Sequence, residues 1–87
     1  AESRKVRAKQ RSGLKKAYEN AEERVQAIEA EVESLHAEQS SPSHYEDPDA
    51  VRTVAQRVAQ LERTLQDTYA EWEQAGAALE AFDAETD

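Results

Sequence analysis

Apolar and small residues recur in alternating steps of three and four positions, in two stretches separated by a polar segment. The first stretch consists of Leu14, Tyr18, Ala21, Val25, Ile28, Val32 and Leu35, and the second of Val51, Val54, Val58, Leu61, Leu65, Thr68 and Trp72. This alternation is the a/d heptad pattern of helices that pack lengthwise on a partner helix. We therefore predict two amphipathic helices, over residues 14–39 and 48–84.

The segment between the stretches, residues 40–47, carries the signals of a turn. Pro42 disfavours helical geometry in the residue before it, so the first helix must end nearby. Asp47 can cap the free N–H groups of a new helix, and Pro48 suits the first helical position. Tyr45 is expected to fold over the adjacent end of the hydrophobic stripe.

Folding the chain back at this turn brings the two stripes together in constant register. Every facing pair then has residue numbers that sum to 86, for example Ile28 with Val58, and Leu14 with Trp72 at the far end. The predicted fold class is all-α, a two-helix antiparallel coiled-coil hairpin. Parallel self-association of whole rods is the competing arrangement, and it leaves the turn without a purpose.

Composition supports one small helical domain over residues 1–87. The chain is 38% hydrophobic and 34% charged, which suffices for one apolar seam but not for a layered core. It contains two glycines, two prolines and no cysteine, so few β-turns and no disulfide are expected. The pattern also offers no membrane span, and we expect a cytoplasmic module cut from a longer polypeptide.

Charge divides the chain into a basic arm, residues 1–13, and an acidic body. Residues 1–16 carry a net charge of +6, and the remaining residues carry -14. The arm and its continuation supply the candidate nucleic-acid-binding residues Arg4, Lys5, Arg7, Lys9, Arg11, Lys15 and Lys16, whose cations could neutralise successive phosphates. A solvated linker is the alternative interpretation. Ser12-Gly13 could be a hinge, although a continuous helix is favoured.

Other polar and aromatic residues give weaker functional signals. Trp72 and Tyr69 could stack on bases, but the seam position of Trp72 favours core packing. His36 and His44 could bind a metal only with a third ligand, and none has suitable spacing. The isolated cations are expected to form ion pairs or to aid solubility: Arg24, Arg52, Arg57 and Arg63. No group of residues predicts catalysis. Past Trp72, Leu79 and Phe82 lack good partners, and residues 85–87 are expected to form an acidic tail.

Three blocks of sequence resemble one known family. They are Ser-Pro-Ser-His-Tyr-Glu-Asp-Pro-Asp-Ala-Val (41–51), Arg-Val-Ala-Gln-Leu-Glu-Arg-Thr-Leu (57–65) and Asp-Thr-Tyr-Ala-Glu-Trp-Glu (67–73). Together with the basic lead-in, they resemble the C-terminal coiled-coil domain of ABC-F ATPases of the Uup type. The Ser12-Gly13 step and the Gly76-Ala77-Ala78 segment depart from the family pattern.

The resemblance implies a module placed behind two ATP-binding cassettes that bind ATP and Mg, with no cofactor in this fragment itself. It further implies DNA or the ribosome and its RNA as partners, beside the tandem ATPase domains of the same chain. The fragment itself is expected to be monomeric. Two other classes stay open: the tRNA-contacting coiled-coil arm of an aminoacyl-tRNA synthetase, such as the valine enzyme, and a structural protein-docking spacer. The synthetase arm would be expected to spread its basic residues along the hairpin.

Overall fold

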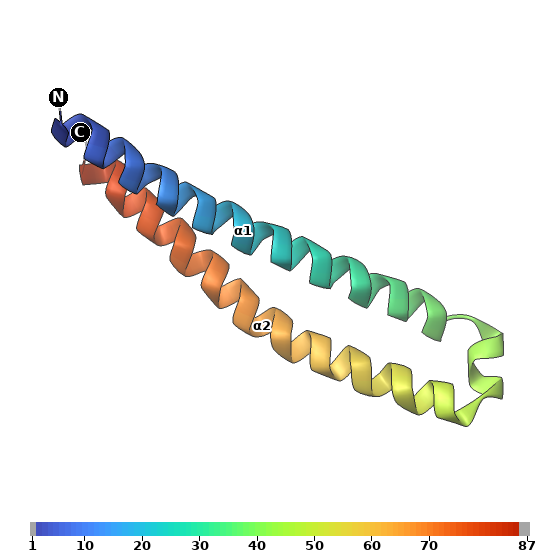
Figure 1. The fold of residues 1–87 in the computed structure, drawn as a ribbon. Coiled ribbons are helices and arrows are strands. Elements are labelled where there is room, and N and C mark those ends of the chain that lie inside the picture. The colour runs from blue at the N-terminus through green and yellow to red at the C-terminus, as the bar shows by residue number, and fades with distance from the viewer. Residues whose placement is uncertain (1, 86–87) are drawn as a thin grey trace.

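The structure, a computed structural model, describes residues 2–85, with the side chain of residue 2 left undescribed. Helix α1 (Glu2–Gln39) runs the length of the molecule, the short 3-10 helix η1 (Pro42–Glu46) forms the turn, and α2 (Pro48–Glu85) returns. The two long helices lie side by side and antiparallel, with both chain ends at the same end of the rod (Figure 1). The rod measures 67 × 16 × 15 Å. The predicted all-α antiparallel hairpin is confirmed.

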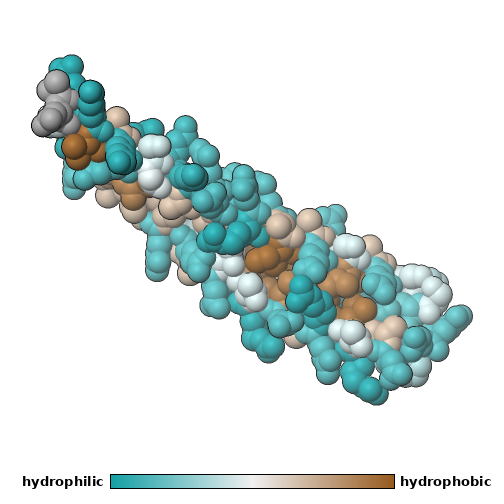
Figure 2. Space-filling model, in the orientation of Figure 1, coloured by the Kyte–Doolittle hydropathy of each residue, from teal (hydrophilic) through white to brown (hydrophobic). Residues whose placement is uncertain are grey.

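The hydrophobic seam predicted from the heptads lies between the helices. Every predicted seam residue is buried or half-buried, and the most buried of them lie near the middle of the rod: Ala21, Val25, Val54, Val58, Leu61 and Thr68. The hydroxyl of Thr68 donates to the carbonyl of Thr64 at 2.8 Å, so this polar core residue is satisfied within its own helix. Figure 2 shows apolar residues gathered between polar flanks on one face of the rod.

The register at the open end differs from the prediction. The ring centroid of Trp72 lies 6.2 Å from that of Tyr18, not opposite Leu14 as predicted, and Phe82 faces Arg7. These pairs have residue numbers that sum to 90 and 89 rather than 86. A half-heptad shift of one helix still matches a and d positions, so the apolar pattern alone does not distinguish the two registers.

The turn follows the predicted capping chemistry. Asp47 accepts hydrogen bonds from the backbone N–H groups of Asp49 at 3.0 Å and Ala50 at 3.3 Å. Pro48 is the first residue of α2, where its missing N–H costs no helical hydrogen bond. Helix α1 ends at Gln39, and the Ser40 hydroxyl donates back to the His36 carbonyl at 3.0 Å. These contacts set both helix boundaries at the turn.

The expectation that Tyr45 shields the end of the seam is wrong. Tyr45 is 66% exposed, whereas its neighbour His44 is 7% exposed and takes the inward position. The rings of the two residues meet edge to face, with centroids 5.3 Å apart. In a 3-10 helix neighbouring side chains point about 120° apart, so only one of them can face the seam.

Helix α1 continues through Ser12-Gly13, so the structure contains a continuous helix there and not a hinge. A side chain at Gly13 would meet open space, which means that packing does not require glycine at this position. At the other terminus, α2 ends at Glu85, one residue beyond the predicted boundary at Ala84. The rest of the predicted acidic tail, Thr86 and Asp87, lies outside the described residues.

Replacing Leu61 with alanine should lower the free energy of unfolding by about 2–5 kcal/mol, because this mid-seam side chain is only 5% exposed. Thermal unfolding followed by circular dichroism measures the effect. The exposed Gln66→Ala serves as the control and should unfold like the parent chain. Equal melting temperatures for Leu61→Ala and the parent would contradict the observed seam.

Candidate functional site

The open end of the hairpin joins the basic arm to the last turns of α2. Arg11 forms two hydrogen bonds to Asp83, from Nε to Oδ1 at 2.8 Å and from a terminal guanidinium nitrogen to Oδ2 at 3.1 Å. This paired geometry suits a planar guanidinium and a carboxylate. The bonds raise the pKa of Arg11 and lower the pKa of Asp83, with charge attraction acting in the same direction and desolvation opposing it.

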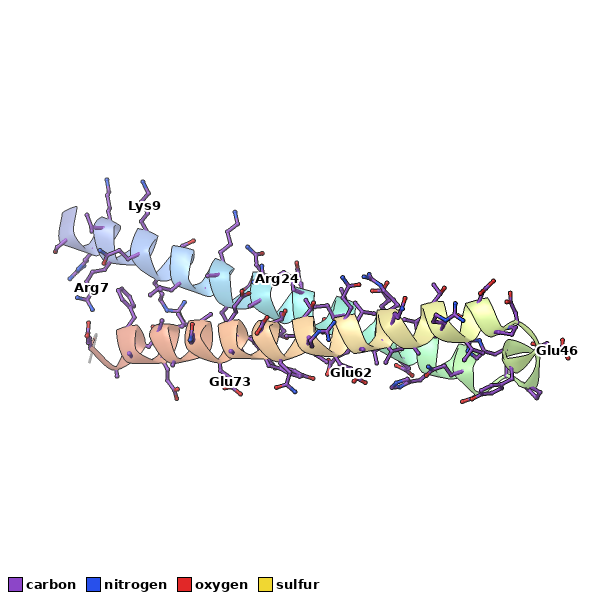
Figure 3. All side chains as sticks on the ribbon, turned by 90° about the horizontal axis from the view of Figure 1, so that it is seen from below. Arg7, Lys9, Arg24, Glu46, Glu62 and Glu73 are labelled. Atoms are coloured by element: carbon purple, nitrogen blue, oxygen red, sulfur yellow. The ribbon has the colours of Figure 1, made fainter. Side chains whose placement is uncertain are left out.

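Arg7 also faces α2, one helical turn before Arg11. Its guanidinium carbon lies 5.2 Å from the centroid of the Phe82 ring, within the range of a cation–π contact. Figure 3 shows Arg7 directed toward the end of α2. Arg4 belongs to the same face because residues 4, 7 and 11 follow the heptad spacing of the seam. We call Arg4, Arg7 and Arg11 the arginine face.

The opposite side of the arm carries lysines. Lys5, Lys9 and Lys16 are separated by four and seven residues, so they form one row along the outer side of α1, the lysine face. Lys9 projects away from α2 (Figure 3). All three are exposed, and none forms an ion pair with another residue in the range 3–85, over which side chains are described. Lys15, beside this row, lies 3.9 Å from Glu19.

The structure therefore separates the seven predicted nucleic-acid-binding residues into the arginine face, the lysine face and Lys15, which lies near Glu19. Arg7 and Arg11 contact α2, while the lysine face remains open to solvent. Sequence reasoning treated the seven cations as one group and missed Phe82 and Asp83 as partners. The signal was available: the heptad continues backward from Leu14 through the arginines and forward from Trp72 to Phe82.

An apolar groove lies next to the open end, along α2. It has a volume of about 640 Å³, and Tyr18, Trp72, Ala77 and Leu79 provide its apolar surface. Gly76 also lines the groove, and a Cβ atom there would lie 3.1 Å from the Tyr18 ring, closer than an ordinary contact. The indole N–H of Trp72 is buried and finds no acceptor among the described residues, an arrangement that normally costs about 1–3 kcal/mol.

Ion pairs and hydrogen bonds connect the helices away from the open end. Arg24 binds Glu71 at 2.8 Å, and Arg57 binds Glu31 at 3.0 Å, as expected for cations scattered in the acidic body. The Tyr69 hydroxyl donates to the Glu29 carboxylate, which raises the pKa of Tyr69 because the bond favours the neutral phenol. Tyr69 thus links the helices and is only partly exposed.

The two histidines each lie near a different carboxylate. Nε2 of His36 is 4.0 Å from Glu62, and Nδ1 of His44 is 4.0 Å from Glu38. Among the described side chains, those of residues 3–85, no group of three or more histidine, aspartate or glutamate residues could hold a metal ion. Over the same range, neither helix is long and apolar enough to cross a membrane.

A comparison with known protein families gives a match that covers most of the chain. The family model described as the ABC transporter C-terminal domain matches residues 9–75. The matched region contains the turn, the full heptad stripes and the part of the basic region that includes Lys9, Arg11 and Lys16. Neither the curated proteins nor the solved structures yielded a match to the chain.

Asp83→Asn should destabilise the hairpin at pH 7, because the neutral amide replaces the carboxylate that Arg11 holds. Since the folded-state pKa of Asp83 is lower than its ordinary value of 3.8, its stabilisation is present above pH 3.8 and is lost as pH falls through the folded-state pKa. The melting temperatures of variant and parent should therefore differ at pH 7 and converge in strong acid.

The matched control is Asp67→Asn, on an exposed aspartate outside the open end. This variant should melt close to the parent at both pH values. A melting difference for Asp83→Asn that stayed constant down to pH 2 would show that the effect does not come from titration of this ion pair.

Proposed function

Because this chain belongs to the ABC transporter C-terminal domain family, we propose that its lysine face binds the phosphates of nucleic acid. The family match supports the C-terminal domain of an ABC-F-type protein, and a parent ATPase fits this assignment. In our proposal the module is non-catalytic and belongs to the Uup type. ATP and Mg bind to the cassettes of the cytoplasmic parent protein, whereas this fragment needs no cofactor.

The exposed lysine face, which forms no ion pair with the side chains that the structure describes, is the observation that carries the proposal. Its three ammonium groups project from one side of a continuous helix, and four residues of helix separate Lys5 from Lys9 by roughly 6 Å. Lysines act as mobile point charges, which suits contacts with phosphates regardless of base sequence. The arginine face serves a different purpose, because Arg7 and Arg11 hold the arm against α2.

The acidic body limits where nucleic acid can approach. The residues after Lys16 carry a net charge of -14, and a polyanion is repelled by such a surface. Contact is therefore confined to the open end of the rod. Both DNA and ribosomal RNA present the required phosphates, and the resemblance to the Uup type favours DNA.

The aminoacyl-tRNA synthetase arm is the less favoured alternative. A basic surface spread along the hairpin would suit a tRNA-contacting arm, but here the cations of the body pair with acids, as in Arg24 with Glu71 and Arg57 with Glu31. The family match also points to ABC proteins. Neither observation supports a tRNA-binding arm.

The triple variant Lys5→Gln, Lys9→Gln and Lys16→Gln should bind nucleic acid much more weakly than the parent, because it removes the phosphate contacts. Fluorescence anisotropy with labelled duplex DNA and with a structured ribosomal RNA fragment, each over a range of salt concentrations, measures the effect. For DNA, the plot of log binding constant against log salt concentration has a negative slope. The magnitude of this slope should decrease by about 2–3, close to one for each lost contact.

A control that removes the same charge from the body, Arg24→Gln, Arg52→Gln and Arg63→Gln, should retain binding at a temperature where circular dichroism shows both variants fully helical. The nucleic acid with the steeper salt dependence and higher affinity identifies the class of partner. Equal loss of binding in both triple variants would attribute the effect to net charge and would overturn the lysine face as the site.

A further inference from the structure

The groove beside Gly76 differs in chemistry from the lysine face. Its floor is apolar, formed by Trp72, Leu79 and the ring of Tyr18. Its volume of about 640 Å³ lies within the range of sites that bind small ligands or a few anchoring side chains. The proposed contact between the lysine face and nucleic acid does not involve this groove.

Carboxylates surround the apolar floor. Glu73 and Glu80 line the groove on α2, and neither forms an ion pair with another residue in the part of the chain that the structure describes. Glu73 projects outward from α2 into solvent (Figure 3). A third carboxylate, Asp83, is held by Arg11 at the open end of the rod. The groove therefore offers apolar surface together with unneutralised negative charge.

We propose that this groove is a docking site for a basic amphipathic helix of a partner protein. Apolar side chains on one face of such a helix would occupy the floor between Trp72 and Ala77, and flanking lysines or arginines would pair with Glu73 and Glu80. This is the helix-in-groove mode of recognition, in which apolar anchors supply affinity and charges supply orientation.

Charge distinguishes this occupant from two others. Nucleic acid is disfavoured, because phosphates would meet Glu73 and Glu80. A second copy of the chain that met this groove with its own is disfavoured, because Glu73 and Glu80 of both copies would then come together.

A direct test titrates the 87-residue chain with a synthetic helical peptide of leucine and lysine, LKKLLKKLLKKLLKK, and follows tryptophan emission. Trp72 is the single tryptophan in the sequence and lines the groove, so its emission reports occupancy of the site itself. Binding should shift this emission. A shuffled peptide has the same composition but no apolar helical face. Its affinity should be lower by roughly tenfold or more.

The discriminating variant is Ala77→Glu. The longer side chain blocks the groove and should weaken binding of the basic peptide. The added negative charge attracts the same peptide, so the steric and the electrostatic effects on affinity are opposite. If the peptide occupies the groove, Ala77→Glu should weaken binding by roughly tenfold or more. The matched control is Ala70→Glu, the same substitution at an exposed position of α2 outside the groove, and it should leave affinity unchanged.

Three results would overturn the proposal. The first is equal or tighter peptide binding by Ala77→Glu, which would assign the attraction to net charge alone. The second is equal affinity for the shuffled peptide. The third is self-association of the chain in sedimentation experiments that is lost in Ala77→Glu, since the groove would then hold a second copy. Because this groove lies outside the lysine face, each result is independent of nucleic-acid binding.

Discussion

A single line of contact between two helices supports this whole structure. Each seam residue is covered by one partner helix, and no large side chain among the described residues is completely buried. Every other interaction is secondary to this seam: Asp47 defines where α2 begins, and Arg57, Arg24 and Arg11 connect the helices at intervals along the rod. A fold with so little core tolerates few losses along the seam.

The same helical period that builds the seam organises the surface of the arm. Because the heptad continues into residues 4–11, Arg7 and Arg11 face α2, and Lys5 and Lys9 face solvent. The chemistry of the two side chains matches these positions. Guanidinium groups pair with a carboxylate and an aromatic ring, whereas ammonium groups remain hydrated. One short basic segment thereby contributes both to folding and to an exposed cationic surface.

The heptad pattern and the turn signals were sufficient to predict the hairpin and the helix boundaries at the turn. The start of the first helix was not predicted by the stripe, because α1 begins at Glu2, twelve residues before the first apolar position of the stripe, Leu14. These signals were also insufficient for the register, because shifting Tyr18 from Thr68 to Trp72 keeps both stripes in contact. They also failed for His44 and Tyr45, whose orientations depend on the 3-10 geometry of the turn. The seven cations of the arm were proposed from sequence, and their binding to nucleic acid stays a prediction. The division of these cations into an arginine face and a lysine face depends on where Phe82 and Asp83 lie across the hairpin. That position is a tertiary property, which the sequence pattern alone does not provide.

The placement of both chain ends at one end of the rod has a mechanical consequence (Figure 1). Any neighbouring domain joined at either terminus meets the molecule at its base, and the turn then lies at the far end of a lever 67 Å long. A rotation of a few degrees at the base displaces the exposed ring of Tyr45 by several ångströms. Helix α1 runs unbroken through Gly13, so the arm and the tip belong to one element, and small rotations at the base correspond to larger displacements at the tip.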